Sequence, residues 1–95
     1  MTQLNLYGNN LTGTIPSELG GLSSLTVLVL RDNNLSGAIP AALENLNSLQ
    51  YLYLDDNPSL VCWQTESALT WAQGLYSYAG PGAVCPFVCL PLVLR

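Results

Sequence analysis

The 95-residue sequence contains no lysine and no histidine, and only two basic and six acidic side chains carry a charge. Without an imidazole or an ε-amino group, it lacks the base that usually activates a serine or cysteine nucleophile and the amine of a Schiff base. Its only glycine pair, Gly20-Gly21, lacks the lysine of a phosphate-binding loop. We therefore expect a protein that is not an enzyme and that uses no cofactor.

Positive charge is scarce, because Arg31 and Arg95 are the only basic residues and the net charge is −4. Nucleic acids and anionic membranes both attract basic surfaces, so neither is an expected partner. The sequence has no apolar run of the roughly 18 residues that a membrane span needs, and its N-terminus does not resemble a signal peptide. No metal site is predicted, since histidine and C-x-x-C pairs are missing and Asp32 and Asp56 are interpreted as solvated acids rather than calcium ligands.

What the sequence does contain is an internal repeat with a period of 24 residues. Each copy has an L-x-L pair, whose alternation predicts a short strand with one buried face, and successive strands should lie parallel and adjacent. Gly13 and Gly37 permit a turn, after which Pro16 and Pro40 begin a single helical or 3₁₀ turn. The equivalent leucines are Leu4, Leu28 and Leu52, and then Leu6, Leu30 and Leu54.

An asparagine follows each predicted strand where the chain leaves the sheet, at Asn9, Asn33 and Asn57. A buried amide without partners costs roughly 1–3 kcal/mol, so each side chain should bond to backbone groups of the turn. We interpret these three residues as a structural ladder along the stacked repeats.

Residues 25–46 complete the pattern L-x-x-L-x-L-x-x-N-x-L-x-G-x-I-P-x-x-L-x-x-L, and residues 1–22 nearly complete it. This pattern resembles the plant-type leucine-rich repeat, with two full repeats and one partial repeat in residues 1–60. The resemblance implies an α/β fold, a right-handed solenoid or horseshoe with a parallel sheet on its concave face and short helical turns on its convex side. Members of that family are mostly ectodomains of receptor-like proteins or secreted inhibitors, and they bind peptides, proteins or glycans.

The same resemblance implies a C-terminal fragment of a larger extracellular or plasma-membrane ectodomain. The alternative is a cytoplasmic scaffold, in which the cysteines would be reduced. Asn10 and Asn34 each begin a glycosylation acceptor pattern. The family's cysteine-paired N-terminal cap is missing and Met1 replaces a leucine, so the chain is expected to begin within the repeats and to self-associate through the uncovered first repeat.

After residue 60 the repeat pattern stops, and residues 61–86 are interpreted as a C-terminal cap. Thr65 is a suitable N-cap for a helix over about residues 65–79, which would cover the last repeat with its apolar side. Cys62 and Cys85 flank this helix, and a disulfide between them would fasten it to the repeats. Two other pairings, both with Cys89, stay open. No structure is predicted for the apolar tail at 87–95.

Nine side chains lie between or just after the buried leucines and should point outwards onto the concave face. Because adjacent strands align equivalent positions, they form three rows. The predicted ligand-binding residues are Gln3, Val27 and Tyr51 in one row, Asn5, Val29 and Tyr53 in the next, and Tyr7, Arg31 and Asp55 in the third. We expect Arg31 to pair with Asp55 and to lie against Tyr7. The predicted function is recognition of a peptide, protein or glycan, and the alternative is a structural capping module without a ligand.

Overall fold

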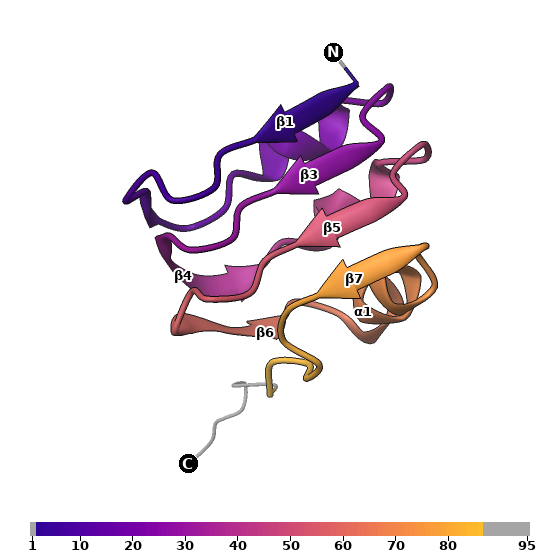
Figure 1. The fold of residues 1–95 in the computed structure, drawn as a ribbon. Helices are drawn as coiled ribbons and strands as arrows, with labels where there is room; N and C mark the ends of the chain where they lie inside the picture. The colour runs from indigo at the N-terminus through magenta and orange to yellow at the C-terminus, as the bar shows by residue number, and fades with distance from the viewer. Residues whose placement is uncertain (1, 87–95) are drawn as a thin grey trace.

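The computed structural model describes residues 2–86, which form two parallel sheets joined by short helical segments (Figure 1). The first sheet has the strand order β1-β3-β5-β7, and its strands span Gln3–Asn5, Val27–Val29, Tyr51–Tyr53 and Ser77–Ala79. The second sheet has the order β2-β4-β6, and its strands span Thr12–Gly13, Asn34–Ile39 and Ser59–Trp63. Strands from successive repeats are therefore neighbours in both sheets.

A helical segment returns the chain from the second sheet to the first. Two 3₁₀ helices, η1 (Ser17–Gly21) and η2 (Ala41–Asn45), directly follow Pro16 and Pro40, whose φ of −68° suits the start of a helical turn. In the third repeat the α-helix α1 (Glu66–Gln73) takes this place, and the Thr65 side chain accepts a hydrogen bond from its first turn as predicted. None of the helices in residues 2–86 has the length and apolar character to cross a membrane.

The 24-residue period sets the register of the first three strands. Leu4, Leu28 and Leu52 lie directly opposite one another in β1, β3 and β5, as the repeat predicts. In the second sheet, Gly13 and Gly37 have φ of +84° and +82°, a conformation that a residue with a side chain adopts only under strain. These glycines therefore allow the bend that both full repeats share.

The apolar core is complete in the second and third repeats and partly open in the first. Leu28, Leu43 and Leu52 are fully buried. The equivalent leucines of the first repeat are only partly buried, because β1 has no neighbour on its other side among residues 2–86. A mainly apolar hollow of about 240 Å³ lies at this end, lined by Leu6, Leu11, Thr12, Thr14, Ile15, Pro16, Leu19, Leu30 and Leu35.

The C-terminal helix is shorter than the sequence analysis predicts. It ends at Gln73 instead of continuing to residue 79, and residues 77–79 form strand β7. The amide of Ser77 donates to the Gln50 carbonyl at 3.1 Å, and the Leu54 amide donates to the Ala79 carbonyl at 2.8 Å. The prediction was wrong because helical spacing of apolar residues does not reveal that the open edge of β5 offers these backbone bonds.

A disulfide joins Cys62 of β6 to Cys85, with 4.9 Å between their Cα atoms. Next to it, the Trp63 amide donates to the Ala83 carbonyl at 2.9 Å, and the Cys85 amide donates to the Trp63 carbonyl at 2.8 Å. Residues 83–85 therefore lie parallel to the end of β6, where Val84 pairs with Trp63 in a single β-bridge. Met1, Cys89 and the predicted tail at 87–95 lie outside the described residues.

Candidate functional site

One face of the four-stranded sheet points away from the core, and we call it the outer face. Its first row contains Gln3, Val27, Tyr51 and Ser77, and its second row contains Asn5, Val29, Tyr53 and Ala79. Tyr7, Arg31 and Asp55 each lie two residues beyond the end of a strand. The structure thus brings all nine predicted ligand-binding residues onto one surface, and β7 adds Ser77 and Ala79 to it.

Valine and tyrosine side chains form the middle of the outer face. Val27, Val29, Tyr51 and Tyr53 are partly buried by their neighbours, and the smaller part of each residue stays open to solvent. The Tyr53 hydroxyl donates a hydrogen bond to the Ser77 Oγ at 3.1 Å and is thereby held in place. The result is an uncharged, largely aromatic surface on a sheet of fixed register.

Arg31 binds Asp55 as predicted, but it does not lie against Tyr7. Its Nε atom is 2.8 Å and 3.0 Å from the two carboxylate oxygens of Asp55, and its guanidinium carbon is 4.8 Å from the centre of the Tyr53 ring. Tyr53 and Asp55 are two residues apart and face the same side of the sheet. The ion pair with Asp55 therefore holds the Arg31 guanidinium above the Tyr53 ring. The hydrogen bond that Arg31 donates to Asp55 is the main cause that raises the pKa of Arg31, so the arginine stays charged.

Tyr76 is a surface residue outside the nine that the sequence analysis predicts to bind a ligand. Its side chain is 81% exposed, and its ring lies edge-on to that of Tyr51 with 5.2 Å between the ring centres. It stands just before β7, so its position follows from a strand that was interpreted as helix. The alternation of tyrosine with small residues over residues 76–79 is the sequence signal that could have indicated this strand.

Two of the three ladder asparagines are buried and bonded in the same way. The Nδ2 atom of Asn33 donates to the carbonyls of Leu6 and Leu30, both at 3.0 Å. That of Asn57 donates to the carbonyls of Leu30 and Leu54, again at 3.0 Å. Each side chain therefore connects its own repeat to the repeat before it.

Asn9 differs from the other two because it is exposed. Its side chain donates to the Tyr7 carbonyl at 3.2 Å, within its own repeat. Its backbone amide donates to the Oδ1 of Asn33 at 2.9 Å, as does the amide of Leu11. No repeat precedes it among residues 2–86, so a carbonyl of a preceding repeat is not there to accept its side chain.

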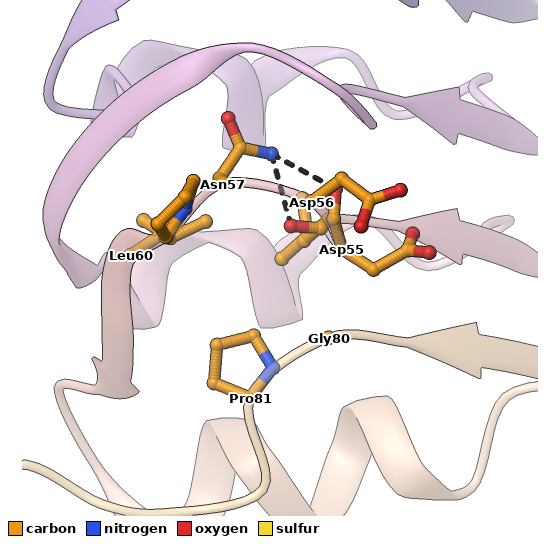
Figure 2. Close-up of a pocket in the computed structure, with 8 residues that line it drawn as sticks. Asp55, Asp56, Asn57, Leu60, Gly80 and Pro81 are labelled. Atoms are coloured by element: carbon orange, nitrogen blue, oxygen red, sulfur yellow. Dashed lines mark hydrogen bonds between the residues drawn. The ribbon is translucent and has the colours of Figure 1, made fainter.

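A hollow of about 430 Å³ lies where the third repeat leaves the first sheet, between the turn at residues 55–58 and Gly80-Pro81 (Figure 2). A side chain at Gly80 would collide with Leu54 and Tyr78, so a glycine is needed where the chain passes them. The hollow is lined by Leu54, Asp55, Asp56, Asn57, Pro58, Leu60, Gly80 and Pro81. Across residues 2–86, no three histidine, cysteine or acidic side chains gather in a group that could hold a metal ion.

Comparison with known families accounts for the repeated positions. The family model described as leucine rich repeat matches residues 1–58, more than half of the chain and the part that contains the three L-x-L pairs and the three asparagines. This chain belongs to the leucine-rich repeat family. The comparison with curated proteins found no match. Leucine-rich repeat domains are, in general, protein-binding modules.

Within this leucine-rich repeat protein, the residue type at outer-face positions differs from one repeat to the next, whereas the residue type at core positions stays the same. Leu4 is followed one and two periods later by leucine, whereas Gln3 is followed by valine and tyrosine. The repeat therefore conserves the buried positions within the chain and leaves the outer positions to carry a specific surface. Asn10 and Asn34, the two glycosylation candidates, are both exposed.

Proposed function

We propose that this leucine-rich repeat protein is a non-catalytic module that recognises a peptide, a protein or a glycan through its outer face. The observation that carries the proposal is the group of solvent-accessible tyrosines on one sheet surface, Tyr51, Tyr53 and Tyr76. The centres of protein interfaces are enriched in tyrosine and depleted in charged residues, and this surface has both features because Arg31 and Asp55 neutralise each other.

The fixed geometry of the outer face also favours recognition. Tyr53 is held by Ser77 on one side and lies under the guanidinium of Arg31 on the other. A side chain that is already ordered loses little freedom when a partner binds, so more of the contact energy contributes to affinity. Tyrosine adds to this advantage because it presents a large area with few rotatable bonds.

The parent protein is proposed to be a plant-type receptor-like or secreted protein with a horseshoe-shaped ectodomain. The Gly-x-Ile-Pro element in both full repeats, followed each time by a 3₁₀ helix, supports the plant type. The Cys62–Cys85 disulfide supports an extracellular or plasma-membrane location, because such bonds persist in oxidising compartments. Exposure of Asn10 and Asn34 leaves both available for glycosylation.

A peptide-display selection tests the proposed surface. Peptides selected on the wild-type chain from a random library would be measured against a Val29→Ser/Tyr53→Ser variant and a Val61→Ser control. Val61 is 60% exposed on β6, in the second sheet, so its substitution alters apolar surface away from the outer face. We expect the double variant to lose about tenfold or more in affinity, since hot-spot tyrosines contribute about 2 kcal/mol, while the control binds as wild type does.

The second candidate function is a structural module that closes a longer array without touching a ligand. The packing of α1 favours it, because Ala68, Leu69 and Ala72 are buried and the Ser67 hydroxyl donates to a carboxylate oxygen of Glu44 in η2 at 2.9 Å. Selected peptides that bind the double variant as tightly as the wild-type chain would support this candidate and contradict recognition by the outer face.

Self-association through the first repeat is a separate part of the proposal. The partly exposed leucines and the hollow of about 240 Å³ at the β1 end support it, since apolar surface of this kind is usually covered. Sedimentation velocity over a range of protein concentrations should show a dimer that grows with concentration. A monomer at every concentration would contradict self-association without affecting the outer face.

A further inference from the structure

We propose that the hollow between Asp56 and Pro81 is a subsite for one arginine or lysine side chain of the partner that lies on the outer face. This inference rests on the proposed function and names the partner's chemistry. Asp55 belongs to both surfaces, as the last residue of the third outer row and as part of the lining of the hollow. A partner on the outer face therefore reaches the hollow without leaving the protein surface.

The polar atoms of the hollow select for a donor with positive charge. The Asn57 side chain is already used, because its Nδ2 donates to the carbonyls of Leu54 and Asp55 (Figure 2) and its Oδ1 accepts from the Leu35 amide. The remaining polar side chains are the carboxylates of Asp55 and Asp56, which only accept hydrogen bonds when ionised. An ammonium or guanidinium group provides both the donors and the charge.

The protein's own positive charge does not fill this role. Arg31 is the only basic side chain in residues 2–86, and it is bound to Asp55 on the outer face. Asp56 forms no salt bridge with Arg31, although its charge helps to raise the pKa of Arg31 from a greater distance, and Asp56 is exposed. Charge complementarity therefore favours a partner that brings a cation of its own.

The apolar walls fit the remainder of such a side chain. Leu54, Pro58, Leu60 and Pro81 contribute carbon surface to the lining. Lysine and arginine lay their methylene stems along apolar surface while the charged group stays near water, and the open hollow offers both environments. An acidic side chain of the partner would be repelled by the carboxylates of the hollow. A fully apolar side chain would displace water from the Asp56 carboxylate without replacing its hydrogen bonds.

A matched pair of ligands tests this subsite by nuclear magnetic resonance on the full chain. N-acetyl-L-arginine amide would be titrated into ¹⁵N-labelled protein, with N-acetyl-L-citrulline amide as an uncharged control of the same shape. We expect saturable shifts of the Asp56, Asn57 and Gly80 amides with arginine. Binding of citrulline should be about tenfold weaker, because it lacks the charge-assisted hydrogen bond. Equal binding of the two ligands, or shifts spread over the whole surface, would overturn the inference.

Two equivalent aspartates provide the matched protein variants. Asp32 and Asp56 stand one period apart, both are exposed, and their φ angles are +60° and +59°. Asparagine tolerates this backbone conformation, so Asp56→Asn and Asp32→Asn should both remain folded. Asp56→Asn should weaken arginine binding about tenfold, whereas Asp32→Asn, outside the hollow, should change it by less than about twofold. An equal loss in both variants would indicate a diffuse acidic field and contradict a subsite.

The display-selected peptides separate this inference from the proposed function. They are expected to be enriched in arginine or lysine and to lose affinity on Asp56→Asn. If they require Val29 and Tyr53 but show no such enrichment and no such loss, the subsite is wrong and outer-face recognition stands. If arginine binds the hollow while the outer-face variant binds peptides as wild type does, outer-face recognition is wrong.

Discussion

The indole of Trp63 and the hydroxyl of Tyr78 join the two sheets near the C-terminal end of the described residues. Trp63 lies in β6 and is completely buried, and its Nε1 donates to the Tyr78 hydroxyl of β7 at 3.0 Å. The Tyr78 hydroxyl in turn donates to the Pro81 carbonyl. Burial raises the pKa of Tyr78 above its ordinary value of 10.0, and the hydrogen bond from Trp63 offsets part of that increase.

This pair predicts an alkaline loss of stability. Because Tyr78 has a higher pKa folded than unfolded, its contribution is complete below pH 10.0 and is lost as the pH rises through the folded pKa. Urea unfolding of wild type and Tyr78→Phe on both sides of that pH should show a smaller alkaline decrease in the variant. Tyr7→Phe, an exposed control, should behave as wild type does. Equal decreases in all three proteins would contradict the assignment to Tyr78.

The two classes of ladder asparagine predict unequal costs of substitution. Asn57→Ala should lower the free energy of unfolding by at least about 2 kcal/mol, because it removes the hydrogen-bond partner of two buried backbone groups, the Leu35 amide and the Leu54 carbonyl. Asn9→Ala removes one exposed side-chain bond and should cost less than about 0.5 kcal/mol. Chemical denaturation of both variants checks this, and equal costs would mean that the buried bonds do not stabilise the repeats.

Adjacent glycines in η1 predict opposite responses to an added methyl group. A Cβ at Gly20 would overlap the carbonyl oxygen of Ala42, so Gly20→Ala must separate η1 from η2 and should cost about 1–3 kcal/mol. A Cβ at Gly21 meets nothing within 4 Å, and Gly21→Ala should be neutral or stabilise by up to about 1 kcal/mol. Thermal and urea unfolding compare them directly. A tolerated Gly20→Ala would show that the two 3₁₀ helices are not held in close contact.

The disulfide predicts redox-dependent stability. It closes a sequence separation of 23 residues, for which chain entropy predicts about 3 kcal/mol. The Cys62→Ser/Cys85→Ser variant should lose about that amount in urea unfolding. A reducing agent should lower the stability of wild type to the same level and leave the variant unchanged. An unchanged midpoint in reduced wild type would contradict a stabilising role.

The part of the fold that follows the 24-residue period, strands β1, β3 and β5, was predictable from the sequence. Because the period is constant, the alignment of Leu4 with Leu28 and Leu52 also fixes the register of the residues between them. The outer rows with Val27, Tyr51 and their equivalents follow from that register without any knowledge of the coordinates. Local periodicity thus determines which residues share a face.

The parts that were not predictable depend on contacts outside the repeat pattern. Tyr78 lies opposite Leu52 at an offset of 26 residues rather than 24, because α1 is longer than the 3₁₀ helices it replaces. Strand β4 has no alternating pattern and forms through its neighbours in the second sheet. The position of Arg31 over Tyr53 rather than Tyr7 depends on side-chain geometry that spacing alone does not give.

The direction of the asparagine bonds has a consequence for how the chain folds during synthesis. The Asn33 side chain donates to the Leu6 carbonyl, and the Asn57 side chain donates to the Leu30 carbonyl. In both cases the asparagine belongs to a repeat that is synthesised after the repeat that it stabilises. Leu6 and Leu30 are therefore synthesised 27 residues before the asparagines that bond to their carbonyl groups, so neither contact can form until those later residues have left the exit tunnel. We therefore expect the repeats to pack in the order of translation, each one after the repeat that follows it has been synthesised.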